Sequence, residues 1–219
     1  MQQINLLKSL PKSKRDVNSR CALKSPNIIA ESKKFGDMYF DGPRAYGYGG
    51  YKYDGRWLPV AADIIAHYAL KSGMRVLDIG CAKGFLIKDL MIACPGLEVF
   101  GIDVSEYALT NCEKEIVGRL HLGSALSLPF PDNSFDLVLA INSIHNLSRD
   151  GVKTALMEIN RVGIGKAFIQ VDAYRSEDEK ELFEQWVLTA EYHDYPENWI
   201  SLFKEAGYAG DYNWTILEG

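Results

Sequence analysis

The sequence predicts a three-layer α/β fold in which helices cover both faces of a mostly parallel sheet. From residue 56 onward, short apolar runs alternate with longer segments whose apolar residues recur at helical spacing. One of the short runs, residues 135–141 (FDLVLAI), is almost entirely apolar, as expected of a strand that is covered on both faces. Alternation of this kind is typical of parallel α/β sheets.

Six strands are predicted from short apolar runs bounded by turn residues. In chain order they span residues 75–79, 97–103, 120–122, 135–141, 166–173 and 211–217. Helices are predicted where the apolar spacing changes to that of a helix face, at residues 56–70, 85–94, 105–117, 149–161, 177–186 and 197–206. Pro59 suits the first turn of the first helix, and Ser105 is the expected N-cap of the third.

Two segments precede this alternation. Residues 1–36 hold eight Lys and Arg against two Asp and Glu and show no sustained period, so they are predicted to be a basic arm that is loosely ordered or only locally helical. Residues 37–55 are crowded with glycine and tyrosine, which predicts a lid segment lying over a site. Residues 56–219 are predicted to form one domain.

The composition limits the class of protein. Hydrophobic residues make up 47% of the 219 and charged residues 24%, and no apolar run approaches the roughly 20 residues of a membrane helix. The first residues lack the apolar stretch of a secretory signal, and the four cysteines show no metal-like spacing. We therefore expect a cytoplasmic protein with no metal site and no membrane partner. Outside the arm, sixteen Lys and Arg stand against twenty-seven Asp and Glu, which disfavours nucleic acid as a partner because its binding depends on neutralising phosphates.

The first predicted strand ends in a turn that indicates a cofactor site. Residues 75–85 read RVLDIGCAKGF, with Asp78 at the strand end and Gly80 and Gly84 in the turn. The G-x-G-x-x-G pattern of dinucleotide sites is missing. Glycines let a ligand approach the backbone, and an acid suits a cofactor with a positive amine. Asp103, at the end of the second strand, can accept hydrogen bonds from ribose hydroxyls. Together these features predict S-adenosylmethionine and not a nicotinamide.

Three stretches, VLDIGCAKG, GIDVS and LPFPDNSFDLVLAINSIHNL, resemble successive motifs of the class I S-adenosylmethionine-dependent methyltransferases. The resemblance covers roughly residues 56–175 and implies a Rossmann-like methyltransferase fold with an antiparallel C-terminal strand. Such sheets have seven strands, so the seventh is either residues 187–191 or absent. Where many members carry an acid for the adenine amine, this chain has Ser124. By the resemblance, the cofactor is bound by Asp78, Gly80, Cys81, Gly84, Asp103, Val104, Ser124, Ala125 and Asn142.

His145 is the predicted general base. It lies in INSIHNL, just past the fourth strand, at the edge where parallel sheets bind their ligands. A placed base removes the proton of a hydroxyl or ammonium acceptor and contributes about 10²–10⁴-fold to the rate. The alternative is a histidine satisfied within its own loop. Asn146 is predicted to orient His145 or to bind the acceptor.

By the same resemblance, two segments are predicted to supply the acceptor pocket. One is the lid, since in related enzymes the residues before the first core helix close over cofactor and acceptor. The other is the aromatic, acidic stretch TAEYHDYPENW, since late insertions in small-molecule methyltransferases often line the pocket. The alternatives are a packed aromatic loop and a surface turn, neither touching a substrate. Arg44 or Arg56 is a candidate to hold a carboxylate. The predicted acceptor-binding residues are Tyr48, Tyr51, Arg56, Asn146, Tyr192 and His193.

The expected reaction is methyl transfer to a hydroxyl, or an amine, of a small polar metabolite. Residues 37–217 resemble bacterial enzymes of surface-polysaccharide and secondary-metabolite pathways, which favours a sugar or sugar nucleotide, and His145 favours a hydroxyl. Two alternatives stay open. One is a methyltransferase that acts on a protein or nucleic acid through the basic arm, and the other is a non-catalytic cofactor-binding scaffold.

Overall fold

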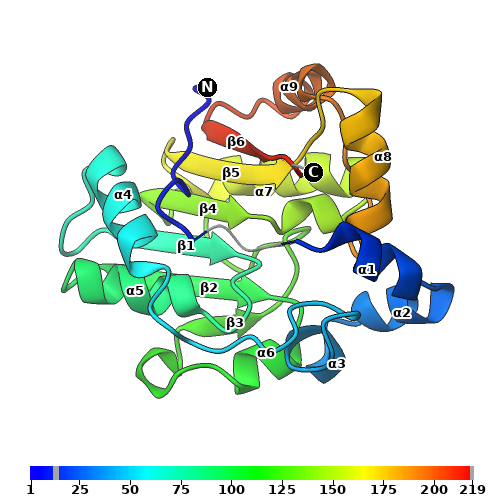
Figure 1. The fold of residues 1–219 in the computed structure, drawn as a ribbon. Coiled ribbons are helices and arrows are strands. Elements are labelled where there is room, and N and C mark those ends of the chain that lie inside the picture. Colours follow the sequence, from blue (N-terminus) through cyan, green and yellow to red (C-terminus); the bar gives the residue numbers. More distant parts are fainter. Residues whose placement is uncertain (12–14, 218–219) are drawn as a thin grey trace.

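The computed structural model of the protein describes residues 1–11 and 15–217. Within these residues, the centre is a six-stranded sheet in which every strand runs parallel to its neighbours (Figure 1). The strand order is β3-β2-β1-β4-β5-β6, so the direction of winding reverses between β1 and β4, where such sheets bind ligands. The strands are β1 (Arg75–Ile79), β2 (Glu98–Asp103), β3 (Leu120–Leu122), β4 (Leu137–Ile141), β5 (Ala167–Asp172) and β6 (Asp211–Thr215).

The sheet divides the core into two apolar clusters, each covered by its own helices. On one face, Ile64 and Leu90 bring α4 and α5 against the strands. On the other face, Leu156 and Trp199 do the same for α7 and α9. Helices on both faces explain why the strands are apolar almost throughout. The helices of this part are α4 (Leu58–Tyr68), α5 (Phe85–Ala93), α6 (Glu106–Thr110), α7 (Arg149–Val162), α8 (Glu177–Trp186) and α9 (Pro196–Glu205), with 3-10 turns at Lys114–Ile116 and Ile144–Asn146.

The expectation of an antiparallel last strand is wrong. β6 pairs with β5 in parallel, with Phe168 opposite Asp211, and residues 187–191 form no strand. The connection explains the direction, because α8 and α9 return the chain to the opposite end of the sheet before β6 begins. An antiparallel neighbour needs a hairpin or a further strand to reverse the chain, and none lies between β5 and β6.

The predicted helix at residues 105–117 is shorter in the structure. Ser105 caps α6 as predicted, since its Oγ accepts a hydrogen bond from the backbone N of Ala108 at 3.0 Å. The helix ends at Thr110, where the Asn111 side chain bonds the Tyr107 carbonyl at 2.8 Å, a local bond that competes with continued helix. The other predicted helices agree with the structure to within about two residues at either end.

The basic arm is locally helical and also packs against the domain. Its helices, and the one that opens the lid, are α1 (Val17–Leu23), α2 (Pro26–Ser32) and α3 (Asp37–Phe40). Ile4 N donates to the Tyr212 carbonyl at 2.9 Å, which joins the first residues to the edge strand β6, and Leu6 is buried. Figure 1 shows α1, α2 and α3 on the side toward which the strand arrows point. The helices of the arm therefore lie beside the carboxyl ends of the strands, whereas its first residues lie beside the beginning of β6.

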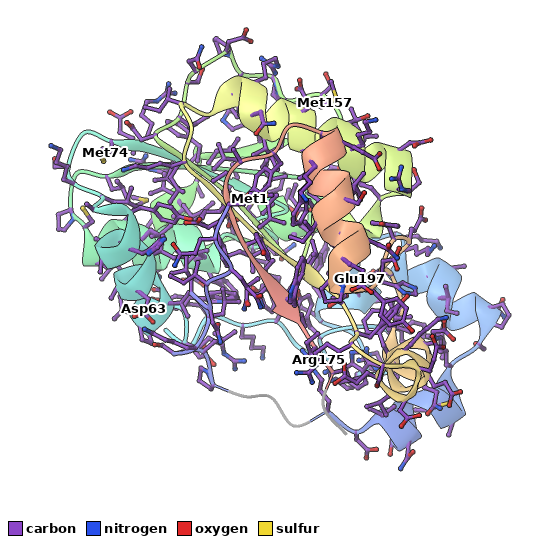
Figure 2. The ribbon with its side chains drawn as sticks, turned by 90° about the horizontal axis from the view of Figure 1, so that it is seen from above. Met1, Asp63, Met74, Met157, Arg175 and Glu197 are labelled. Carbon is purple, nitrogen blue, oxygen red and sulfur yellow. The ribbon has the colours of Figure 1, made fainter. Side chains whose placement is uncertain are left out.

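The two ends of the sheet are well separated along the strands. Met74 immediately precedes β1, and Arg175 follows β5 after two residues. Figure 2 shows them on opposite sides of the molecule, with Arg175 near the helices of the arm. Across residues 1–11 and 15–217, none of the helices combines the length and the apolar character that a membrane span requires.

Candidate functional site

Two neighbouring cavities lie at the carboxyl ends of the strands. They share the side chains of Tyr39, Tyr48 and Asn142 as a common wall. The first cavity is bounded by the glycine turn and the ends of β2, β3 and β4, and the predicted cofactor residues among its lining are Gly80, Asp103, Val104, Ser124, Ala125 and Asn142. The second cavity has a volume of about 470 Å³ and lies between α1, the lid and the segment after α8.

Gly80 is required by close packing in the turn after β1. Its φ is +75°, and a Cβ atom there would lie 2.2 Å from the Cβ of Ser143. Ser143 in turn donates a hydrogen bond from Oγ to the Ile79 carbonyl at 2.6 Å. The turn after β1 and the loop after β4 are thus locked together at the point where the sheet order reverses, and both line the first cavity.

Gly84 and Cys81 serve packing beneath the turn and do not line either cavity. Gly84 has a φ of +71°, and a Cβ there would lie 2.4 Å from Cδ1 of Ile116. The Sγ of Cys81 lies 2.6 Å from where a Cβ on Gly101 would stand. The resemblance assigned both residues to the cofactor, whereas in this structure their side-chain positions face the core.

Asp78 is a buried carboxyl group without an internal partner. It is 5% exposed, and none of the described residues donates a hydrogen bond to it. Burial and the nearby charge of Asp103 raise its pKa to about 7. A buried carboxylate of this kind favours a bound cation, because a cation removes the cost of its isolation. Asp78 itself lines neither cavity, but it lies two residues before Gly80, which lines the first, and its carboxyl group suits the positively charged amine of S-adenosylmethionine.

Asp103 is held at the end of β2 by backbone groups. Its carboxylate accepts hydrogen bonds from Ala82 N at 2.7 Å and from Ser105 N at 2.8 Å, which fix its orientation. Burial raises its pKa, while these hydrogen bonds act in the opposite direction. Each carboxylate oxygen can accept a further bond, and Asp103 lines the first cavity, so it fits the ribose hydroxyls that the sequence assigned to it.

Asn142 stands between the two cavities in a left-handed conformation with φ of +51°. Asn tolerates that region better than most residues. Its Oδ1 accepts a hydrogen bond from Oγ1 of Thr215 at 2.7 Å, so the amide orientation is fixed by β6. Asn146, predicted to contact the acceptor, lines the first cavity instead. Its Oδ1 is buried and lacks a hydrogen-bond partner within the described chain.

His145 lies at the floor of the second cavity beside Asp172. The imidazole is 5% exposed. Its Nδ1 lies 3.2 Å from the backbone N of Asp172 and 3.3 Å from Oδ2 of the same residue. The backbone N–H favours the tautomer with its proton on Nε2, whereas the carboxylate favours a proton on Nδ1. Trp199 Nε1 donates to the Asp172 carbonyl at 3.0 Å and fixes that residue.

Tyr192 and His193 lie outside both cavities. The Tyr192 ring packs against Trp199 with centroids 4.6 Å apart. The His193 ring lies 4.8 Å from that of Phe183, and burial lowers its pKa. In this conformation the two rings pack against neighbouring side chains and do not line the second cavity. The backbone N of Tyr192 also donates to the carbonyl of His145 at 3.0 Å, so the segment positions the predicted base.

The lid is folded down onto the glycine turn. The rings of Tyr48 and Tyr51 contact each other in a tilted arrangement with centroids 4.3 Å apart, and Tyr51 stacks on Phe85 at 4.7 Å. Tyr48, Tyr51 and Arg56 all line the second cavity, as their predicted contact with the acceptor requires. Arg56, however, is already paired with Asp54 through Nη2 and Oδ2 at 2.5 Å, so its charge is neutralised.

Several residues of the second cavity were missed from the sequence. They come from the basic arm and from α8, which meet the lid only in the folded protein, and they are Arg15, Arg20, Phe183 and Trp186. Tyr39, which lines both cavities, and Phe40, which lines the first, were also missed, although they belong to the aromatic stretch FGDMYFDGPRAYGYGGYKYDG. The composition of that stretch was the available signal.

Comparison with known proteins agrees with this geometry. The profile of a family described as a methyltransferase domain matches residues 77–169. The chain is 33% identical over 108 residues to a sterol 24-C-methyltransferase of Gibberella zeae, with 45% of this chain and 28% of that protein aligned. It is 31% identical over 116 residues to a demethylmenaquinone methyltransferase of Symbiobacterium thermophilum, with 49% and 45% aligned. The chain thus spans less than half the length of either relative.

A solved structure with a similar fold is the protein bound to the Haloferax volcanii Trm112 methyltransferase activator. The TM-score is 0.56 at 21% sequence identity, over 67% of this chain and 66% of the other. This likeness shows the fold of the sheet and its helices.

Proposed function

We propose that this chain methylates a hydroxyl or an amine of a small polar metabolite. Its fold and the methyltransferase domain at residues 77–169 support a class I S-adenosylmethionine-dependent methyltransferase. The observation that carries the proposal is the common wall of the two cavities, formed by Tyr39, Tyr48 and Asn142. A cofactor in the first cavity and an acceptor in the second would meet at this wall. Holding two reactants in this way supplies a large part of a displacement reaction's rate.

The residues of the first cavity would bind and orient the cofactor. When bound, S-adenosylmethionine would supply a methyl group on a sulfonium sulfur, which an oxygen or nitrogen nucleophile can take while the sulfur leaves as a neutral thioether. Asp78 would pair with the cofactor's amine, and Asp103 would accept hydrogen bonds from its ribose. The lid would exclude water from the junction, since Tyr48, whose ring contacts that of Tyr51, lines both cavities.

His145 would take the acceptor's proton through Nε2. A proton on Nδ1 can be donated to the Asp172 carboxylate, 3.3 Å away, and this leaves the Nε2 lone pair for the acceptor. Hydrogen bonds to a charged group are roughly twice as strong as neutral ones, so the carboxylate outweighs the competing backbone N–H. As the imidazole gains its second proton, the same carboxylate would stabilise the positive charge.

The shape of the second cavity supports a small acceptor. Its volume of about 470 Å³ lies in the range of small-molecule sites. The basic arm contributes Arg15 and Arg20 to its wall. This favours a role of the arm in forming the pocket over a role in docking a macromolecule. A sugar or sugar nucleotide remains the proposed acceptor.

The test is release of S-adenosylhomocysteine from the purified protein in the presence of S-adenosylmethionine and a fractionated extract of small polar metabolites. We expect release that depends on one fraction and survives removal of proteins and nucleic acids from it. Tight cofactor binding without release in any fraction would contradict the proposal, and would favour a macromolecular acceptor or a scaffold.

A further inference from the structure

Three arginines gather around one tryptophan in the wall of the second cavity. The Cζ atom of Arg20 lies 3.9 Å from the ring centroid of Trp186, that of Arg44 lies 5.3 Å away and that of Arg15 lies 5.9 Å away. They come from α1, the lid and the residues just before α1, segments that meet only through folding. All four side chains line the cavity.

The charge of this trio is not neutralised within the described part of the chain. No carboxylate among residues 1–11 and 15–217 lies within ion-pair distance of Arg15, Arg20 or Arg44. Arg20 is only 8% exposed, and burial together with the charges of Arg44 and Arg15 lowers its pKa to about 10. Like charges at this separation, partly withdrawn from water, are costly unless an anion joins them.

Backbone carbonyls orient these guanidinium groups without cancelling their charge. Nη2 of Arg20 donates to the carbonyls of Arg44 and Gly47, each at 2.9 Å, and Arg44 donates to the same Gly47 carbonyl. Arg15 makes no hydrogen bond with any residue described in the structure. A guanidinium carries five N–H donors, so most donors of the trio remain available to a ligand in the cavity.

The trio stands out against the rest of the protein. The whole chain carries a net charge of −5, yet the cavity is positive. Its cationic side chains are Arg15, Arg20, Arg44, Lys52 and Arg56, against the carboxylates of Asp54 and Asp172. A local field of this sign in an acidic protein concentrates anions at the pocket.

We propose that Arg15, Arg20 and Arg44 form a subsite for a phosphoryl group of the methyl acceptor, which rests on the proposed function of the second cavity. A carboxylate engages one guanidinium fork, whereas a phosphoryl group offers three oxygens and up to two negative charges to several arginines at once. The same cavity reaches Asn142 and His145. The phosphoryl end of the acceptor would therefore lie at the arginines, with the group to be methylated beside the cofactor.

The test is direct binding of inorganic pyrophosphate to the full chain by calorimetry at low salt, with inorganic phosphate and malonate as comparison anions. Arg15→Gln is the informative variant because the Arg15 side chain makes no hydrogen bond with the described residues and its ring contact is the distant one with Trp186 in the same wall; Arg44→Gln tests a second arginine of the trio. We expect pyrophosphate affinity to fall about tenfold or more in each. Arg119→Gln is the matched control, since Arg119 lines neither cavity, and it should bind as the parent does. A thermal unfolding curve of each variant checks that it is folded.

The outcomes separate the subsite from the proposed function because S-adenosylmethionine binding is measured on the same samples. Cofactor binding without pyrophosphate binding, or equal pyrophosphate affinity in all variants, would overturn the phosphoryl subsite and leave the proposed function standing. Malonate binding as tightly as pyrophosphate would overturn the phosphoryl assignment. Arginine-dependent pyrophosphate binding without any cofactor binding would support the anion site and overturn its link to methyl transfer.

Discussion

The Nζ atom of Lys83 lies 2.6 Å from Oδ2 of Asp41 and 2.9 Å from the carbonyl oxygen of Tyr51, so the glycine turn is tied to the lid at two points. The Lys83 side chain is 7% exposed. Burial acts to raise the pKa of Asp41, but hydrogen bonds from Lys83 and Tyr107 outweigh it and lower the pKa. The lysine of the cofactor turn thus also holds the lid closed.

Replacing Lys83 with Met should loosen the lid without removing any group that contacts the cofactor. We expect the dissociation constant for S-adenosylmethionine to rise about tenfold, because a hydrogen-bonded charge pair whose lysine is buried is lost, mainly through a faster dissociation rate. Stopped-flow dissociation measures this directly. Lys166→Met is the control, because Lys166 also donates to a backbone carbonyl, that of Tyr68 at 3.0 Å, away from the lid. An equal increase of the dissociation rate in the two variants would contradict the role of Lys83 in holding the lid closed.

The sheet and the cofactor turn were predictable from the sequence because their signals are local. The apolar run at β1, the acid at its end and the glycines after it lie within eleven consecutive residues, 75–85. The glycines reflect a requirement of the local backbone, which is the positive φ of Gly80 and Gly84. Ser105 as a helix cap is another local requirement, and the structure confirms it.

The wall of the second cavity was not predictable, because it depends on contacts between distant segments. Arg20 and Trp186 are in contact, yet nothing in the spacing of either residue indicates the other. The direction of β6 was mispredicted for the same reason, since it follows from the path of α8 and α9. Tyr192 and His193 were assigned to the pocket from their place in a late insertion of the resembled family, whereas packing against Trp199 and Phe183 places their rings elsewhere.

The raised pKa of Asp78 predicts that cofactor binding depends on pH. The folded protein keeps a proton on Asp78 up to about pH 7, whereas the unfolded chain loses it near 3.8. The free energy of unfolding should therefore fall as the pH rises through this window. A cationic amine binds the ionised carboxyl, so the affinity for S-adenosylmethionine should rise up to about tenfold per pH unit from pH 5 to 7 and then level off.

Calorimetry between pH 5 and 8 tests the assignment to Asp78. Asp78→Asn should bind the cofactor at least about tenfold more weakly at pH 7.5 and lose most of the pH dependence. Asp103 is the neighbouring group that could mimic the effect, because burial raises its pKa as well. A full slope that persists in Asp78→Asn would assign the proton to Asp103 instead.

The geometry of His145 and Asp172 predicts how their variants differ. His145→Gln should lower kcat by about 10²–10⁴-fold for a hydroxyl acceptor and leave the cofactor dissociation constant unchanged. Asp172→Asn should lower kcat nearly as far although the imidazole stays in place, because the backbone N–H then favours the tautomer with its proton on Nε2 and the charge that stabilises the protonated imidazole is lost. Steady-state kinetics against pH provide the readout, since the acid limb of the profile should disappear in His145→Gln. His121→Gln, whose ring packs on Phe130, is the control, and an unchanged acid limb in His145→Gln would rule out the base.

Gly80 and Gly73 form a matched pair for separating backbone strain from steric contact. Their φ values are +75° and +83°, but a Cβ on Gly73 meets nothing within 4 Å, whereas a Cβ on Gly80 would lie 2.2 Å from that of Ser143. Gly73→Ala should lower the free energy of unfolding by about 1–2 kcal/mol, the cost of a left-handed residue with a side chain. Gly80→Ala should add about 1–3 kcal/mol for overpacking and weaken cofactor binding, because Ser143 can yield only by moving the loop that lines the first cavity. Urea unfolding of both variants measures these losses. Equal losses of the free energy of unfolding would mean that residue 80 must be glycine because of its φ alone, and that close contact with the loop after β4 is not the reason.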